Sequence, residues 1–149
     1  MKAVVLYDTA YGNTRTIAES VASKLGSGAA AVQVDGFDPG ILHPGDLLVV
    51  GSPINGWKPT ARIAESLADL GRRGLAGVKA AAFDTRVKLF IHGDAAKKMT
   101  KALTEAGATI VAEPMAFYVK GSEGPLLEGE EERAAAWAAD LVASVQRQA

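Results

Sequence analysis

Short, uninterrupted apolar runs recur along this 149-residue chain, and a segment with apolar residues at helical spacing follows most of them. A run without polar alternation is typical of a strand covered on both faces, as in parallel sheets. We predict strands at residues 2–7, 30–34, 46–50, 78–83 and 108–113. We predict helices that end at Gly26, that cover about 60–72 and about 94–106, and that begin after Gly129. This alternation indicates one α/β domain over residues 1–149, a three-layer sandwich around a five-stranded parallel sheet with right-handed crossovers.

Two features near the C-terminus refine this pattern. Pro114 cannot donate to a ladder, so the apolar segment at 115–119 is either an extension beyond a kink or an edge strand. The glutamates at 130–132 are expected to stabilise the start of the last helix. Trp137 shares one helix face with Leu141 and Val145, so we expect it in the core.

Composition limits the chemistry that the chain can perform. Sixteen basic and 17 acidic residues give a net charge of -1, which leaves no broad cationic face for nucleic acid or an anionic membrane. The absence of cysteine excludes disulfides and thiolate metal sites, so redox chemistry would need a bound cofactor. No apolar run is long enough to span a bilayer and no signal-peptide pattern is visible, so we expect a cytoplasmic protein.

In open parallel sheets a ligand binds beyond the carboxyl ends of the strands, which selects the loops after Tyr7, Val50 and Phe83. The first loop offers hydroxyls, an amide side chain and backbone N–H groups before a helix, a combination suited to a single phosphate. Its candidate residues are Thr9, Ala10, Tyr11, Gly12, Asn13 and Thr14. Neither GxGxxG nor GxxxxGK[ST] is present. The alternative is that Thr9 or Asn13 only caps the helix.

The other two loops carry groups that suit a flat, partly apolar ligand. Trp57 is placed to stack on an aromatic ring, or else to anchor its loop on the surface. The candidates after the third strand are Ser52, Pro53, Ile54, Asn55, Gly56 and Trp57, with backbone amides of 54–56 available to the ring. The candidates after the fourth strand are Asp84, Thr85 and Arg86, with Phe90 and His92 on the same rim. Arg86 and Lys88 can face an anionic ring or an acidic partner.

Together these loops resemble those of flavodoxin-like proteins. The first loop is similar to the family's phosphate pattern [ST]-x-T-G-x-T, with Thr9, Gly12, Asn13 and Thr14 at matching positions. Tyr11 departs from that pattern, but YDTAYGNT at 7–14 resembles the loops of the flavodoxin modules in flavodiiron proteins, as does the GSP turn at 51–53. The segments FDTR, GDAAKK and EGPLLEGEEE, which begin at residues 83, 93 and 123, resemble small stand-alone flavodoxin-domain proteins.

The resemblance implies strand order 2-1-3-4-5 and flavin mononucleotide (FMN) as cofactor, with its phosphate at residues 9–14 and its ring between Trp57 and Arg86. We hypothesise that the ring stacks on Trp57, that backbone groups of 54–56 and 84–86 contact its edge, and that Arg86 stabilises the anionic reduced flavin. The protein would pass one or two electrons between redox partner proteins, as a monomer or weak dimer. No nucleic acid or membrane partner is expected.

Two other functions on the same fold remain open. One is an NAD(P)H-dependent quinone or flavin reductase, which we favour less because the chain is short for a second, nicotinamide pocket. The other is a flavin-free interaction module. A signalling receiver domain is disfavoured because Ser52 stands where its phosphoacceptor carboxylate would be and Asp8 lacks an acidic neighbour. His43 and His92 form no metal site of recognisable spacing, and no catalytic residue is predicted.

Overall fold

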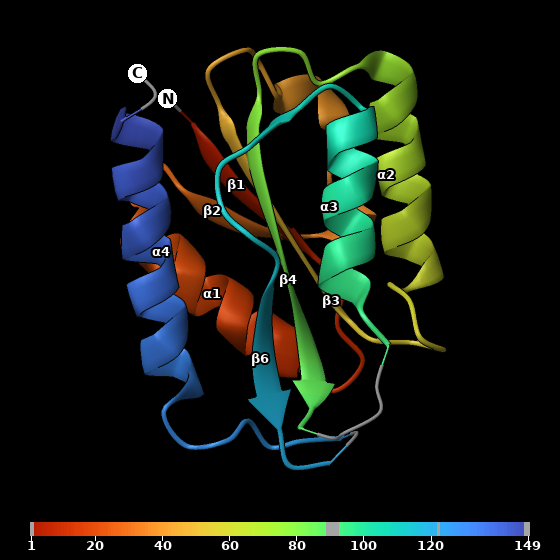
Figure 1. Cartoon of the computed structure of the whole chain (residues 1–149), viewed down its shortest axis with the longest axis vertical. Coiled ribbons are helices and arrows are strands. Elements are labelled where there is room, and N and C mark those ends of the chain that lie inside the picture. The colour runs from red at the N-terminus through yellow and green to blue at the C-terminus, as the bar shows by residue number, and fades with distance from the viewer. Residues whose placement is uncertain (1, 89–92, 122, 148–149) are drawn as a thin grey trace.

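The computed structural model describes residues 2–88, 93–121 and 123–147. Its strands form one parallel sheet in the order β2-β1-β3-β4-β5, and β6 also pairs with β4 (Figure 1). The strands are β1 (Ala3–Tyr7), β2 (Ala30–Gln33), β3 (Leu47–Pro53), β4 (Lys79–Val87), β5 (Thr109–Ile110) and β6 (Met115–Val119). The helices are α1 (Asn13–Leu25), α2 (Ala61–Arg73), α3 (Ala95–Glu105) and α4 (Glu130–Arg147), with two 3-10 turns at Val34–Gly36 and Pro39–Ile41. The predicted α/β sandwich and strand order are confirmed.

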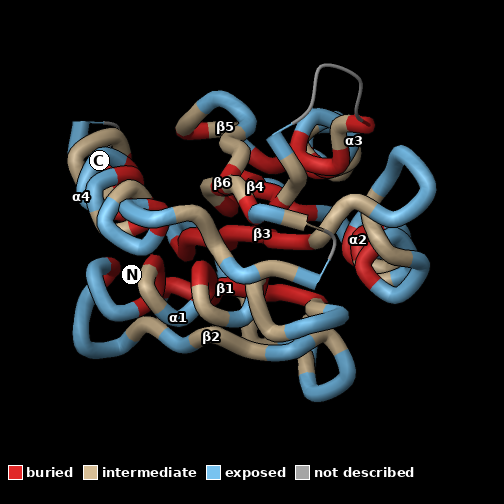
Figure 2. The backbone as a smooth tube through the Cα atoms, turned by 90° about the horizontal axis from the view of Figure 1, so that it is seen from below, coloured by how far each residue is buried: buried red, intermediate tan, exposed pale blue. Residues whose placement is uncertain are grey.

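Two helices cover each face of the sheet. The β1 side chains alternate between the two cores: Val5 packs with α1 and α4, whereas Leu6 packs with α2 and α3. Figure 2 shows the buried backbone gathered in the central strands between the two pairs of helices. Burial of both faces accounts for the uninterrupted apolar runs in the sequence.

The third and fourth strands are longer than predicted. We expected them to end at Val50 and Phe83, but β3 continues to Pro53 and β4 to Val87. Asp84 is unfavourable in strands as a residue type, yet here its buried carboxylate accepts hydrogen bonds from Arg86 and from the backbone N–H of Ala96. These partners remove the cost of a polar residue in the strand. Residues 84–87 are therefore part of the sheet rather than a loop.

The break at Pro114 divides the last edge of the sheet into two strands. β5 pairs with the start of β4 and β6 with its end, where Met115 lies opposite Phe83. The segment at 115–119 is thus both a continuation beyond the break and an edge strand. Its outer side is covered, because Glu130 accepts the Tyr118 N–H at 2.8 Å and Leu126 bridges to Val119. Glu130 therefore binds the edge strand as well as starting α4.

Three aromatic rings fill the core between the sheet and α4. Phe83, Phe117 and Trp137 meet edge to face with ring centroids 5.7 to 5.9 Å apart, so the core position predicted for Trp137 is confirmed. The Phe83 ring lies directly over Gly51, where an added Cβ would stand 2.1 Å from the ring. Only a glycine at this position of β3 leaves room for the ring.

Candidate functional site

A cavity of about 490 Å³ opens at the carboxyl end of the sheet, the lower edge in Figure 1 to which the arrowheads of β4 and β6 point. Twelve of the 15 predicted site residues line it: Thr9, Ala10, Tyr11, Asn13, Thr14, Pro53, Ile54, Asn55, Gly56, Trp57, Thr85 and Arg86. Four further lining residues were not predicted from the sequence: Thr60, Val87, Gly93 and Val119. The volume falls within the range of single-ligand pockets.

The first loop leads into a helix whose N-terminus has no side-chain cap. Gly12 is the N-cap residue, with φ of 93°, and it makes no side-chain hydrogen bond to the helix. The Thr9 hydroxyl instead accepts the Gly12 N–H at 2.9 Å, and Asn13 donates to the Glu123 carbonyl at 3.2 Å. The capping alternative for Thr9 and Asn13 is therefore wrong. The first N–H groups of α1 are left facing the cavity end of the sheet, an arrangement that binds a phosphate.

A pair of buried hydroxyls joins this helix to the sheet. The Oγ1 atoms of Thr14, in the first turn of α1, and Thr85, on β4, lie 2.7 Å apart. Both residues line the cavity, and both are at most 5% exposed. One hydroxyl donates to the other, so one hydrogen of the pair is left to donate elsewhere. A ligand oxygen at the α1 N-terminus can accept it.

Asp8 connects the first loop to the start of α2. Its buried carboxylate accepts the Thr9 N–H at 2.8 Å, the Thr60 hydroxyl at 2.7 Å and the Arg62 guanidinium at 2.9 Å. The attraction of Asp8, followed by that of Asp35, raises the pKa of Arg62. Thr60 also caps α2 by accepting the Ile63 N–H. The Asp8 carboxylate thus connects the first loop to the end of the second loop.

The second loop closes in a tight two-residue turn. Asn55 and Lys58 exchange backbone hydrogen bonds of 2.7 and 3.3 Å, and the two residues between them, Gly56 and Trp57, have φ of 58° and 72°. Two positive φ values in succession are the signature of a type I′ turn. The Asn55 N–H is consumed by this turn, so of the three predicted ring-facing amides only those of Ile54 and Gly56 remain without a partner among the described residues.

Trp57 takes an uncommon conformation for a bulky residue. A positive φ costs an L-residue with a large side chain on the order of 1–2 kcal/mol, and such strain clusters at ligand sites. Trp57 is 57% exposed and lines the cavity. Gly93 packs against the backbone of Trp57: a Cβ on Gly93 would stand 2.3 Å from the Trp57 Cα. The segment before α3 therefore supports this turn without any side chain in between.

Below the cavity, Arg86 lies between two carboxylates. Its guanidinium donates to Asp84 at 2.8 and 2.6 Å and to Asp94 at 3.2 Å. The hydrogen bonds to Asp84 are the main reason that the pKa of Arg86 is raised. Burial raises the pKa of Asp84, and the bonds from Arg86 and Ala96 oppose that effect. Arg86 lines the cavity, but its positive charge is partly neutralised by the carboxylates of Asp84 and Asp94.

Three predicted residues lie near the cavity without lining it. Asp84 is fully buried beneath Arg86. Ser52 is buried and links the Thr60 N–H to the Pro53 carbonyl. Gly12 shapes the helix start. Phe90 and His92 lie outside the described residues, and His43 is an exposed turn residue.

Two kinds of site are missing from the described ranges. No group of three His, Cys, Asp or Glu side chains there could hold a metal ion. None of the helices described combines the length and the apolar character needed to cross a membrane.

Comparison with known proteins agrees with this geometry. The family model described as flavodoxin matches residues 5–137. The chain belongs to the flavodoxin family. Flavodoxins bind FMN and transfer electrons, so FMN is the cofactor and electron transfer the general activity. No curated protein sequence matches the chain significantly.

Solved structures similar to this flavodoxin share its fold at low sequence identity. Oxidised flavodoxin 1 from Bacillus cereus superposes with a TM-score of 0.82 over 96% of this chain and 98% of its own, at 20% identity. A flavodoxin from the domain Archaea gives 0.83, over 98% and 99%, at 19% identity. The rubredoxin:oxygen oxidoreductase from Desulfovibrio gigas gives 0.81 at 19% identity; the match covers 99% of this chain but 36% of that one.

The residues at the cavity fit FMN in chemistry as well as in place. The uncapped start of α1 with Gly12 in a left-handed conformation suits a phosphate, and the exposed ring of Trp57 suits a flat aromatic face. The Thr14–Thr85 pair supplies a buried hydroxyl donor at the same end.

Proposed function

We propose that this flavodoxin is an electron carrier that holds FMN by its phosphate at the start of α1 and passes one or two electrons between redox partner proteins. The observation that carries the proposal is the uncapped helix start at Gly12, at the mouth of a cavity large enough for one ligand. An N-terminus of this kind provides N–H donors and the positive end of the helix dipole without a lysine or arginine. Bound FMN supplies the redox chemistry.

Different residues around the cavity bind different parts of the cofactor. Backbone N–H groups at the start of α1 and the Thr14 hydroxyl bind the phosphate. Trp57 stacks on the ring, and the amides of Ile54 and Gly56, with backbone groups of 84–86, contact its edge. Tyr11, which is 59% exposed, flanks the opening. These assignments follow from the residues that line the cavity.

Arg86 tunes the charge beside the ring. Its guanidinium is fixed at the cavity wall by Asp84 and Asp94, so it offers a constant orientation toward the ligand. A cation at that position favours the reduced, negatively charged cofactor over the oxidised one. Because two carboxylates share the guanidinium, the effect is smaller than that of an unpaired arginine.

The carrier function is favoured over an NAD(P)H-dependent reductase by the distribution of cavities. A second cavity among the described residues, of about 220 Å³, is lined by Pro44, Leu70 and Val78 and lies at the opposite end of the sheet rather than beside the first. A reductase needs a nicotinamide pocket beside the flavin. Mixing the FMN-loaded protein with NADPH in a stopped-flow instrument separates the two functions: rapid bleaching without a partner reductase would support the enzyme.

Calorimetric titration with FMN tests the proposal itself. We expect saturable binding of one FMN per chain and, for protein purified without added cofactor, the visible absorption of a flavin. A protein that is purified colourless and that does not bind FMN would instead be a flavin-free interaction module.

A further inference from the structure

Two lysines, Lys97 and Lys98, lie in the first turn of α3. α1 ends with Lys24, α2 ends with Arg72 and Arg73, and α4 begins with three glutamates. α3 has no basic residue in its last turn, and its two first-turn lysines follow the N-cap residue Asp94, whose carboxylate accepts the Lys97 N–H at 2.8 Å. Cations at a helix N-terminus are unfavourable.

These two lysines lie at the end of the sheet that holds the cavity. α3 begins directly after Gly93, which packs on the backbone of Trp57. Lys58 follows Trp57 in the chain, and Lys88 follows Val87, another cavity residue. We call the four exposed side chains Lys58, Lys88, Lys97 and Lys98 the lysine face.

The lysine face is not neutralised by neighbouring carboxylates. In residues 2–88, 93–121 and 123–147, every ion pair has an arginine or a histidine as its cation. The Lys88 ammonium lies 5.4 Å from the centre of the Tyr118 ring, a contact that leaves its charge in place. The whole chain has a net charge of -1, but the lysine face carries a local excess of positive charge.

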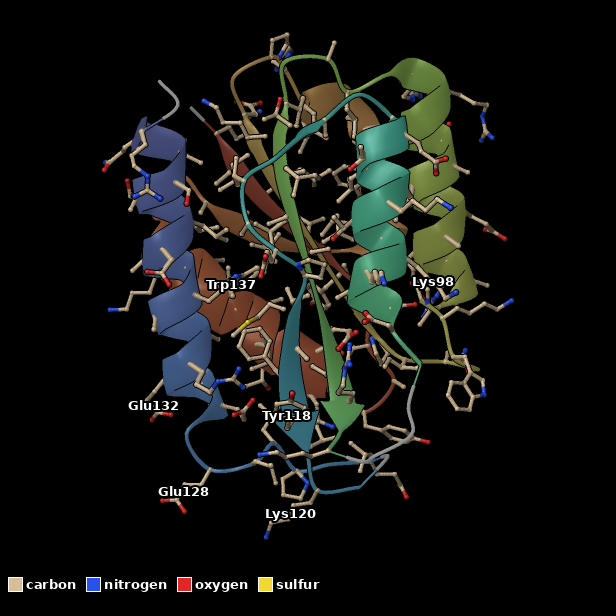
Figure 3. All side chains as sticks on the ribbon, in the orientation of Figure 1. Lys98, Tyr118, Lys120, Glu128, Glu132 and Trp137 are labelled. Carbon is tan, nitrogen blue, oxygen red and sulfur yellow. The ribbon has the colours of Figure 1, made fainter. Side chains whose placement is uncertain are left out.

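Negative charge gathers on the other flank of the same end. The exposed acidic side chains there are Glu123, Glu128, Glu131 and Glu132. Figure 3 shows Lys98 on the α3 side of the sheet and Glu128 and Glu132 on the α4 side. The flank beside Trp57 thus carries lysines, whereas the flank beside the start of α4 carries four exposed glutamates together with Lys120 and Arg133.

We propose that the lysine face is the docking surface for a redox partner protein with an acidic patch. This inference rests on the proposed electron-carrier function. Docking there places the partner beside Trp57, the side of the cavity assigned to the flavin ring. Two exposed aromatic residues of the described ranges, Tyr11 and Trp57, give the contact an apolar centre with a charged rim. The acidic flank would repel a long polyanion such as nucleic acid, whereas a compact acidic patch on a protein meets only the lysines.

The experiment uses a reduced plant-type ferredoxin as the acidic probe and the oxidised, FMN-loaded protein as acceptor. One electron leaves the iron–sulfur cluster and is gained by the flavin, and stopped-flow absorbance gives the second-order rate constant. We expect this rate to fall as salt is added. Replacing both helix lysines, Lys97→Gln with Lys98→Gln, should lower the low-salt rate by about tenfold. The control Lys24→Gln with Arg72→Gln removes the same charge from the opposite end of the sheet and should leave the rate unchanged.

A folding defect is distinguished by thermal unfolding. The reversal Lys97→Glu with Lys98→Glu suits the α3 dipole, so its melting temperature should rise while its rate with ferredoxin falls further. A lower melting temperature together with a lower rate would mean that the lysines stabilise the fold, and would overturn the proposal.

Two other probes identify competing occupants. Faster electron transfer at low salt to the basic protein cytochrome c, with no effect of the lysine substitutions, would assign docking to the acidic flank. Binding of a single-stranded oligonucleotide that the lysine substitutions abolish, with an unchanged ferredoxin rate, would assign the surface to nucleic acid. Either result overturns the proposal. Failure to bind FMN would instead overturn the proposed function, and calorimetry measures it separately.

Discussion

The hydroxyls of Thr14 and Thr85 lie 2.7 Å apart in the wall of the cavity, and they join the first turn of α1 to β4. Because the pair is buried, the orientation of its hydrogens is decided by what else can accept them. A phosphate at the helix start would take the Thr14 hydrogen and leave Thr85 to donate to Thr14. Thr85 then acts on the ligand through Thr14.

Thr85→Val should therefore weaken FMN more than riboflavin, which lacks the phosphate. The loss of one hydrogen bond is worth about 1 kcal/mol, or roughly fivefold in FMN affinity. Fluorescence titration with both flavins measures the difference. Thr104→Val, which removes an exposed helix hydroxyl far from the cavity, is the control. Equal losses for FMN and riboflavin would place the hydroxyl pair away from the phosphate.

Replacing Trp57 by asparagine tests the effect of its backbone conformation separately from the effect of its ring. Asparagine tolerates the left-handed conformation better than a bulky residue, so Trp57→Asn should keep the turn and leave the unfolding free energy equal or higher by about 1 kcal/mol. The loss of stacking should weaken FMN binding by about tenfold, equivalent to about 1.4 kcal/mol. Chemical denaturation of the apoprotein and FMN titration check both parts. Unchanged FMN affinity would show that the indole does not touch the flavin.

Gly93→Ala should disturb the cavity through the backbone of Trp57. The added methyl would stand 2.3 Å from the Trp57 Cα, a distance that requires the two segments to separate. We expect both a lower melting temperature and weaker FMN binding. Gly71→Ala is the matched control: nothing lies within 4 Å of the added Cβ in α2, so it should stabilise the protein by about 0.5–1 kcal/mol. A Gly93→Ala protein that binds FMN normally would contradict the packing.

Asp84 should make the protein lose stability as pH rises, against the usual behaviour of carboxylates. Burial raises its pKa in the folded state, so the folded protein holds this proton at a pH where the unfolded chain has released it. The stabilising contribution is therefore complete below the unfolded pKa and disappears as pH rises through the folded pKa. Measured against Asp84→Asn, the wild type should lose unfolding free energy from about pH 4 upward. A rise in the same window would reverse the assigned direction.

Arg86→Ala should lower the reduction potential of the bound flavin, because a cation is removed from beside the ring. Without Arg86 the buried Asp84 has lost its main charge partner, and its pKa will rise further. A proton taken up by Asp84 replaces part of the lost charge, so the shift in potential should be larger at high pH than at low pH. Spectroelectrochemical titration at two pH values measures it, with Arg73→Ala, remote from the cavity, as control. A potential equal to that of the wild type would remove the role assigned to Arg86.

The sequence predicted most of the fold because apolar runs and helical spacing are local signals. It also located the first and second loops, since strand ends and glycine-containing turns can be read from a few neighbouring residues. It did not predict that β4 continues through Asp84, because the partners that satisfy this carboxylate include Ala96 at the start of another helix. Contacts of that kind depend on how helix and sheet pack.

Two other features of the site could not be predicted from the sequence for a similar reason. Gly93 and Trp57 are far apart in the chain, and nothing in either segment indicates that their backbones touch. The Asn55 N–H is used inside its own turn because two consecutive residues have positive φ values. The second of these is Trp57, and a positive φ is not expected for a tryptophan. Residue type indicated the ring-binding role proposed for Trp57, but not its backbone conformation.

The Phe83 ring occupies the space that any side chain at Gly51 would need. These two positions on neighbouring strands therefore have to change together: a methyl group gained on β3 must be matched by a smaller residue on β4. Redesign of the inner wall facing α4 would have to begin with this pair, and a library that varied either position alone would recover mostly the parent residue.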